Sequence, residues 1–202
     1  MADRFWRQGP LAHLGLAVRP SVDSAAAGVT LSERPFRAAI NIRGAVDRLE
    51  ELESVIGLPL PVQPLQSVSG DRITVLSLGP DEWLLVVDDA DGTVAEQLVI
   101  ALRTGLTGAG TAVTDVSDSY AVIGVEGVNV RDLLAKGCPL DLYPTKFHVG
   151  EAAQTLIGRA DVILHQIDDK GFDLYVRRSF AEYLWLWLED AGLEFGVALA
   201  AG

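Results

Sequence analysis

The 202-residue sequence predicts an α+β fold in which one strand-helix-hairpin-helix unit occurs twice and forms mixed sheets packed with helices. Two observations predict it. The same order of strand, helix, proline corner, hairpin and helix runs through both halves, and both final helices open with a capping-box pattern. We therefore expect an irregular N-terminal arm at residues 1–35, a first repeat at 36–110 and a second repeat at 111–202.

Each element of the first repeat has its own signal. The arm before it mixes glycine, proline, serine and alanine with little periodicity, which predicts irregular structure. After the arm, an alternating run predicts a strand, and a run with apolar side chains at helical spacing predicts a helix that ends at Gly57. Two β-rich runs joined at Gly79-Pro80-Asp81 predict a hairpin. The expected elements are a strand at 37–44, a helix at 45–57, a corner at 58–64, a hairpin at 72–89 and a helix at 93–106.

The second repeat presents the same elements in the same order. The separation between matched residues grows from 83, for Gly44 and Gly127, to 89, for Trp83 and Phe172, because residues 148–160 lengthen the second copy. The capping boxes also match, as Thr93-x-x-Glu96 and Ser179-x-x-Glu182; further matched pairs are Leu49 with Leu133 and Pro59 with Pro139. The expected elements are a strand at 120–127, a helix at 128–137, a corner at 138–144, a hairpin at 161–178 and a helix at 179–193.

Cys138, the only cysteine of the chain, is expected to be a buried packing residue rather than a reactive thiol. It follows a predicted helix that Asn129 is expected to cap and that Gly137 is expected to end in the left-handed conformation. Pro139 then prevents the helix from continuing, and Leu58 occupies the equivalent place in the first repeat. A single cysteine cannot form an internal disulfide, which is consistent with a reducing compartment.

Composition excludes several classes of protein. With 16 basic and 28 acidic residues the net charge is −12, which opposes binding to nucleic acid or to an anionic membrane. No apolar run reaches the roughly 18 residues of a membrane span, and a weak resemblance to a signal peptide is interrupted by His13 and by Arg19-Pro20. We therefore expect a cytoplasmic protein without membrane or nucleic-acid partners.

The residues that usually carry chemistry form no recognisable site. Residues 114–120 place two aspartates and two serines close together but lack the glycine and glutamate of a calcium loop, so we interpret them as a strand with a polar face. The glycine-rich residues 105–113 follow a helix rather than a strand, unlike a dinucleotide-binding loop. Three histidines are scattered without metal-ligand spacing: His13, His148 and His165. We expect no catalytic, cofactor-binding or metal-binding residue on this chain.

The predicted C-terminal helix is apolar on almost every side. Trp185 and Trp187 project about 200° apart around it, so both cannot face one sheet. One alternative is that both are covered inside this chain, by its sheet and by the helix of the first repeat. The other is that one of them contacts a partner subunit, since indole is enriched in interfaces. The predicted interface residues are Trp6, Tyr183, Trp185 and Trp187.

Four blocks of sequence together resemble the gamma subunit family of heterotetrameric sarcosine oxidase: residues 78–86, 113–127, 133–147 and 172–188. The resemblance implies a non-catalytic subunit of a flavoenzyme that oxidatively demethylates sarcosine to glycine, with hydrogen peroxide and a one-carbon unit as products. It also implies that FAD, FMN, NAD and tetrahydrofolate are held by the alpha, beta and delta subunits. The implied fold is that of folate-binding aminomethyltransferases, a duplicated α+β unit whose halves exchange strands.

Three other functions remain open from the residues. The first is a stand-alone folate-binding aminomethyltransferase, and the second is a general interaction module of the same fold. The third is a folate-binding protein of iron-sulfur cluster assembly, a family with a KGCYxGQE signature. Lys136-Gly137-Cys138 matches its first three letters, but Pro139 and Leu140 follow in place of the remaining signature residues. The role of that motif is therefore not assigned to Cys138.

Overall fold

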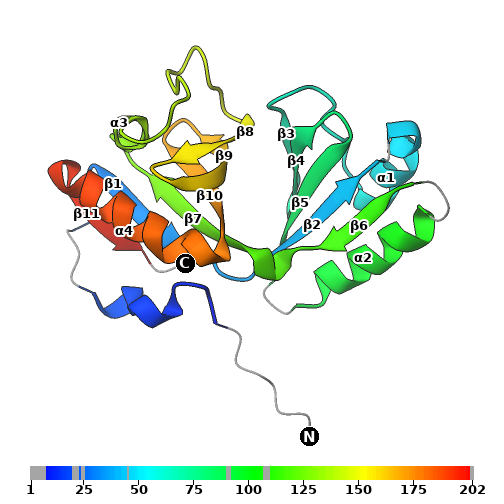
Figure 1. The fold of residues 1–202 in the computed structure, drawn as a ribbon, viewed down its shortest axis with the longest axis horizontal. Helices are drawn as coiled ribbons and strands as arrows, with labels where there is room; N and C mark the ends of the chain where they lie inside the picture. Colours follow the sequence, from blue (N-terminus) through cyan, green and yellow to red (C-terminus); the bar gives the residue numbers. More distant parts are fainter. Residues whose placement is uncertain are drawn as a thin grey trace, which may run out of the picture.

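The computed structural model describes residues 8–19, 23, 26–44, 46–89, 92–106 and 110–200. Two β-sheets lie side by side, and each carries its α-helices on the face turned away from the other sheet (Figure 1). The layers therefore follow in the order helices, first sheet, second sheet and helices. This is the α+β, internally duplicated fold that the sequence predicts. No helix within the described ranges has the length and apolar character needed to cross a bilayer.

The first repeat supplies most of a five-stranded antiparallel sheet in the order β3-β4-β5-β2-β6. Its helices α1 and α2 cover the outer face of this sheet (Figure 1). The strand, hairpin and helices predicted for this repeat are all present. Their bounds are β2 Arg37–Arg43, α1 Leu49–Ile56 after the 3₁₀ turn Val46–Arg48, β3 Ser67–Ser69, β4 Ile73–Gly79, β5 Glu82–Asp88, α2 Val94–Gly105 and β6 Ala112–Asp115.

The second repeat supplies most of a six-stranded sheet in the order β11-β1-β7-β10-β9-β8. This sheet is mixed, because β1 and β11 pair in parallel and the other neighbours are antiparallel. Strands β8 and β11 were not predicted; β8 lies in the segment that lengthens this repeat. The bounds are β1 Val29–Glu33, β7 Tyr120–Glu126, α3 Val130–Ala135, β8 Ala152–Ile157, β9 Ala160–Asp168, β10 Gly171–Arg177, α4 Ala181–Gly192 and β11 Val197–Ala200.

The two repeats exchange their leading strands. Strand β1 precedes β2 in the chain but pairs with β7 of the second repeat, with Leu31 opposite Val125. Strand β6 precedes β7 in the chain but pairs with β2 of the first repeat, with Ile42 opposite Val113. The exchange matches the arrangement that the family resemblance implies. It also corrects the expectation of an irregular arm, because residues 29–33 are a strand. The strand is short, and it directly follows a run of alanine and glycine in the sequence, so its signal is weak.

The strands of both hairpins are apolar on both faces because each sheet packs on two sides. Alternate side chains of β5 face different layers, so Trp83 and Leu85 pack toward α1 and α2. Leu84 and Val86 pack between the two sheets, together with Tyr175 of β10. This double burial explains the uninterrupted apolar run of β5, which a strand with one solvated face would not show.

Both predicted capping boxes are wrong. Neither Thr93 nor Ser179 makes a side-chain cap, and α4 begins after the 3₁₀ turn Arg178–Phe180. At α2 the cap is Asp89, a buried carboxylate that accepts hydrogen bonds from the backbone N–H groups of residues 93, 94 and 95 at 3.0, 3.1 and 3.0 Å. Burial acts to raise the pKa of Asp89, but these donors together hold it below the usual value.

The environment of Cys138 confirms that it is buried, with its Sγ 3.7 Å from Thr155 Oγ1. The expected details of the preceding helix end differ. Asn129 makes no side-chain cap, and the φ of Gly137 is not positive. Gly137 is required for a different reason: a Cβ there would lie 2.6 Å from the ring of Trp187. The glycine therefore makes room for α4 rather than for a left-handed turn.

The identity of the α2 cap is directly testable. Replacing Asp89 by alanine leaves three backbone N–H groups without their acceptor, so Asp89→Ala should lower the free energy of unfolding by about 2 kcal/mol. The matched variant Thr93→Ala should change it by less than about 0.5 kcal/mol. Urea denaturation followed by circular dichroism measures both values, and equal losses in the two variants would contradict the assignment of Asp89.

Candidate functional site: the polar cleft between the sheets and the outer face of α4

A polar cleft of about 360 Å³ lies between the two sheets, beside the segment that connects β1 to β2. Arg34 of this segment and Arg37, the first residue of β2, also line two neighbouring cavities of about 240 and 560 Å³. The crossing chain thus forms a common wall of all three. The residues that line the cleft are Arg34, Arg37, Ser67, Ser69, Thr74, Val149, Gly150, His165, Gln166, Ile167, Asp173 and Tyr175.

Arg34 binds the crossing segment to the six-stranded sheet. Its Nε lies 2.6 Å from Oδ1 of the buried Asp173, and its Nη2 lies 2.5 Å from Oε1 of Glu126. Burial raises the pKa of Asp173, and the guanidinium of Arg34 opposes this effect. Gly124 in the middle of β7 makes the approach possible, since a Cβ there would lie 2.6 Å from Arg34 Nε. Arg37 begins β2, and its Nε lies 2.8 Å from Oδ1 of Asp88, the residue opposite it on β5 of the same sheet.

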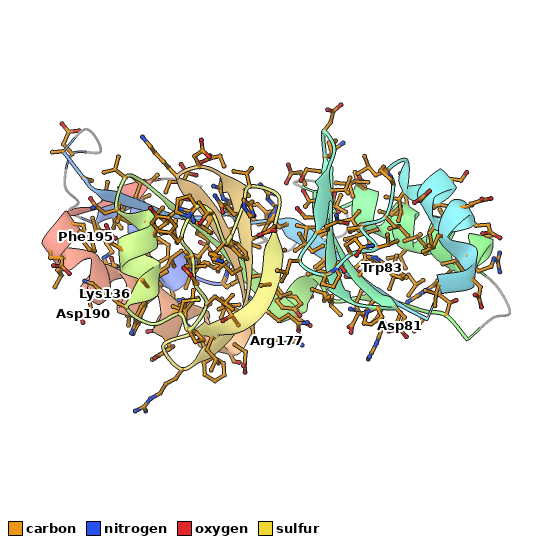
Figure 2. The ribbon with its side chains drawn as sticks, turned by 90° about the horizontal axis from the view of Figure 1, so that it is seen from above. Asp81, Trp83, Lys136, Arg177, Asp190 and Phe195 are labelled. Atoms are coloured by element: carbon orange, nitrogen blue, oxygen red, sulfur yellow. The ribbon has the colours of Figure 1, made fainter. Side chains whose placement is uncertain are left out.

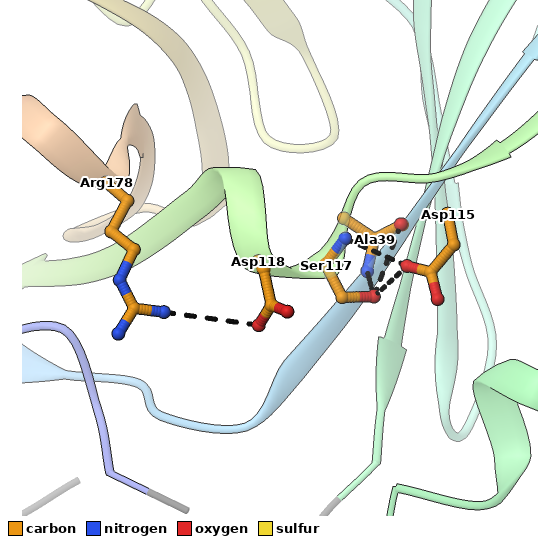
Figure 3. Close-up of polar contacts among 5 residues, drawn as sticks. All are labelled: Ala39, Asp115, Ser117, Asp118 and Arg178. Atoms are coloured by element: carbon orange, nitrogen blue, oxygen red, sulfur yellow. Dashed lines mark hydrogen bonds and ion pairs between the residues drawn. The ribbon is translucent and has the colours of Figure 1, made fainter.

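The second crossing, between β6 and β7, is held by a serine (Figure 3). The backbone N–H of Ala39 donates to Ser117 Oγ at 3.1 Å, and Ser117 Oγ lies 2.5 Å from Asp115 Oδ1, to which it donates. Asp118 points toward Arg178 at 4.0 Å. Residues 114–120 are thus the end of β6 followed by a 3₁₀ turn at Ser117–Ser119, not one continuous strand. Asp115 stabilises the turn by accepting hydrogen bonds from the backbone N–H and the hydroxyl of Ser117.

His165 joins the sheets from the opposite wall of the cleft. It is buried on β9, and its Nε2 lies 2.9 Å from Ser67 Oγ of β3. Ser67 donates its one hydroxyl proton to the carbonyl of Gly150 at 2.7 Å, so His165 Nε2 must carry the proton that Ser67 accepts. His165 Nδ1 is then an acceptor, and it has no hydrogen-bond partner among the described residues. Burial lowers the pKa of His165 to about 4.

This geometry is not that of an activated nucleophile. A catalytic serine donates its proton to histidine, whereas here His165 donates to Ser67. Asp173, the acidic residue that lines the cleft, is likewise engaged by Arg34. The Ser67–His165 hydrogen bond connects the two sheets, and the ion pairs of Arg34 fix the crossing segment to the six-stranded sheet. Sequence reasoning did not single out Arg34, Asp173 or His165 as partners, because their contacts join strands far apart in the chain.

The predicted interface residues have different positions. Trp185 is fully buried in the core of the six-stranded sheet, so packing removes it from the candidates. Trp187 is partly buried and lies over Gly137 and Gly158 of this same chain. Tyr183 is exposed, and its hydroxyl accepts a hydrogen bond from the backbone N–H of Arg159 at 3.1 Å. Trp6 lies outside the described residues.

Other apolar residues of α4 and its flanks are more exposed than the tryptophans. Phe180 and Tyr183 meet edge to face, with ring centroids 6.4 Å apart. They belong to a row of exposed apolar side chains on the outer side of the helix. The three-residue spacing of these side chains indicates the row in the sequence, whereas the prediction had relied on the tryptophans. The exposed fractions are 44% for Phe180, 37% for Tyr183, 47% for Leu186 and 72% for Leu193.

Comparison with known proteins identifies the family. Residues 47–194 match the "Sarcosine oxidase, gamma subunit family". The chain is 31% identical over 199 residues to the sarcosine oxidase subunit gamma of Corynebacterium sp. (strain U-96), covering 96% of this chain and 94% of that one.

Solved structures agree with this match. A chain of the heterotetrameric sarcosine oxidase from Corynebacterium sp. U-96, in complex with pyrrole 2-carboxylate, is similar with a TM-score of 0.83 and 31% identity, covering 94% of this chain and 96% of that chain. The glycine cleavage system aminomethyltransferase T from Bartonella henselae shares the fold at 14% identity with a TM-score of 0.61, covering 86% of this chain and 48% of that one.

The buried imidazole predicts an acid-sensitive fold. Because the pKa of His165 is about 4 when folded and near 6.5 when unfolded, the unfolded chain gains a proton first as the pH falls. The contribution of His165 to the free energy of unfolding is complete above pH ~6.5. As the pH falls toward ~4, the free energy of unfolding should decline by about 3 kcal/mol. Urea denaturation across this range measures the decline.

The controls separate His165 from the other titrating groups. His165→Gln should flatten this part of the profile, whereas His148→Gln should not, since His148 is exposed. Asp173 contributes with the opposite sign because its pKa is raised, and its effect is common to all three proteins. A profile of His165→Gln parallel to that of the wild type would refute the assignment.

Proposed function

This chain belongs to the sarcosine oxidase gamma subunit family, and we propose that it is the non-catalytic subunit of a heterotetrameric flavoenzyme that oxidatively demethylates sarcosine to glycine. The products are hydrogen peroxide and a one-carbon unit. The observation that carries this proposal is a match over nearly the whole length of both chains, in sequence to a gamma subunit and in fold to a chain of the heterotetramer.

The chemistry of the cleft supports a structural rather than a catalytic role. Arg34 and Arg37 neutralise the acidic groups around them, and the Ser67–His165 hydrogen bond has the polarity opposite to that of a nucleophile and its base. We assign the oxidation to the alpha, beta and delta subunits, which hold FAD, FMN, NAD and tetrahydrofolate in this proposal. The complex works in the cytoplasm.

Assembly would use the surface of α4 that the chain leaves open. Of the predicted interface residues that the structure describes, Tyr183 and part of Trp187 remain accessible after folding. Aromatic side chains at such positions offer a large apolar area together with a polar group for hydrogen bonding. We therefore place the partner contact on this side of the six-stranded sheet.

Co-expression tests the proposal. The affinity-tagged chain should co-purify with the three other subunits, and the complex should show flavin absorbance and sarcosine-dependent peroxide formation. The isolated chain should show neither property, because the polar groups of its cleft are engaged with one another. Tight tetrahydrofolate binding by the isolated chain in calorimetry, or failure to co-purify, would instead favour the stand-alone folate-binding protein.

A further inference from the structure

The outer side of α4 carries an apolar row with one carboxylate inside it. Phe180, Tyr183 and Leu186 follow at three-residue spacing, and Leu193 continues the row beyond the helix end. Asp190 stands four residues after Leu186 and three before Leu193, so it lies within this row rather than at its border. Asp190 is exposed, and it lies at the periphery of this half of the molecule (Figure 2). We call these five residues the α4 row.

Asp190 differs from the other carboxylates of this region. Each of those already has a side-chain partner in this chain, whereas Asp190 has no ion-pair partner within the described part of the chain. The pairs are Glu182 with His13 at 3.2 Å, Glu189 with Arg19 at 3.0 Å, and Glu194 with Lys136. Asp190 is therefore the carboxylate of the α4 row, and its nearest row members along the helix, Leu186 and Leu193, are apolar.

The equivalent helix of the first repeat does not share this surface. Ile100 of α2 takes the place of Leu186 and is also exposed, at 59%. Its neighbours are polar, however: Gln97 stands in place of Tyr183, and Thr104 in place of Asp190. Thr104 donates a hydrogen bond to the carbonyl of Ile100 at 2.8 Å and so satisfies its hydroxyl locally. The α4 row is thus particular to the second repeat and not a by-product of the duplicated fold.

We infer that the α4 row binds an apolar segment of a partner subunit that places a lysine or arginine opposite Asp190. An apolar surface gains free energy when it is covered, but covering it would strip water from the carboxylate. A cationic side chain within the covering segment offsets that loss and fixes the register of the two surfaces. This inference rests on the proposed function, since it takes the occupant to be another subunit of the oxidase.

Charge and apolar variants in the co-expressed complex test the inference. Asp190→Lys should weaken association at least about tenfold, because it opposes the partner's cation, and Asp190→Asn should weaken it less. Leu186→Glu should also weaken association. The matched controls are Ile100→Glu, at the equivalent place on α2, and Asp81→Lys, in the exposed hairpin turn of the other half (Figure 2); both should assemble as the wild type does.

Association is measured by titrating purified chain into the complex of the other subunits, at low and high salt. The gap between wild type and Asp190→Lys should narrow at high salt if an ion pair forms. Thermal melting of each free variant verifies folding, which substitutions at exposed positions should preserve. A Lys→Asp or Arg→Asp substitution in a partner that restores binding to Asp190→Lys would identify the cation.

The outcomes separate the inference from the function on which it rests. If the wild type assembles and all variants assemble equally well, the α4 row is not the contact and the inference fails alone. If the isolated chain self-associates and Leu186→Glu makes it monomeric, the occupant is a second copy and the inference also fails. If the wild-type chain does not assemble with the other subunits, the proposed function fails first.

Discussion

Hydrogen bonding between the leading strand of each repeat and the sheet of the other repeat is the constraint on which the structure depends. Without β1, the six-stranded sheet would also lose β11, because β11 pairs with β1 and not with β7. Without β6, the five-stranded sheet would lose the strand that covers β2. Neither half is therefore complete on its own, and the chain behaves as one unit although its sequence is a repeat.

The crossing also explains why polar groups lie in the middle of an apolar protein. Two connecting segments must pass between the sheets, and their backbone and side-chain polar groups need partners there. Arg34 and Ser117 meet this need at the two crossings, and Gly124 provides the space for the guanidinium. The resulting cleft has the polarity of an active site, but its groups are directed at each other.

The two repeats have diverged on the outer faces of their final helices. Their matching helices α2 and α4 pack on their own sheets in the same way, through Leu102 in one and Trp185 and Leu188 in the other. Their outer faces differ. The neutral polar side chains of Gln97 and Thr104 on α2 correspond to the aromatic Tyr183 and the charged Asp190 on α4. A duplicated fold needs only the inner faces to agree, which leaves the outer face of one copy free to recognise a partner.

The sequence by itself determined the strand-helix-hairpin-helix order of each repeat, the duplication, the burial of Cys138 and the family, because these follow from local periodicity and from contiguous blocks. Tertiary structure alone decided which strands pair, which carboxylate caps α2 and which tryptophan is buried. Asp89, and not Thr93, caps α2 because the chain enters this helix from the end of β5, where Asp89 lies. Trp185, and not Trp187, faces the sheet because of the rotation of α4 on it. Such choices depend on contacts between residues far apart in the chain, and neither a period of 3.6 nor a period of 2 contains them.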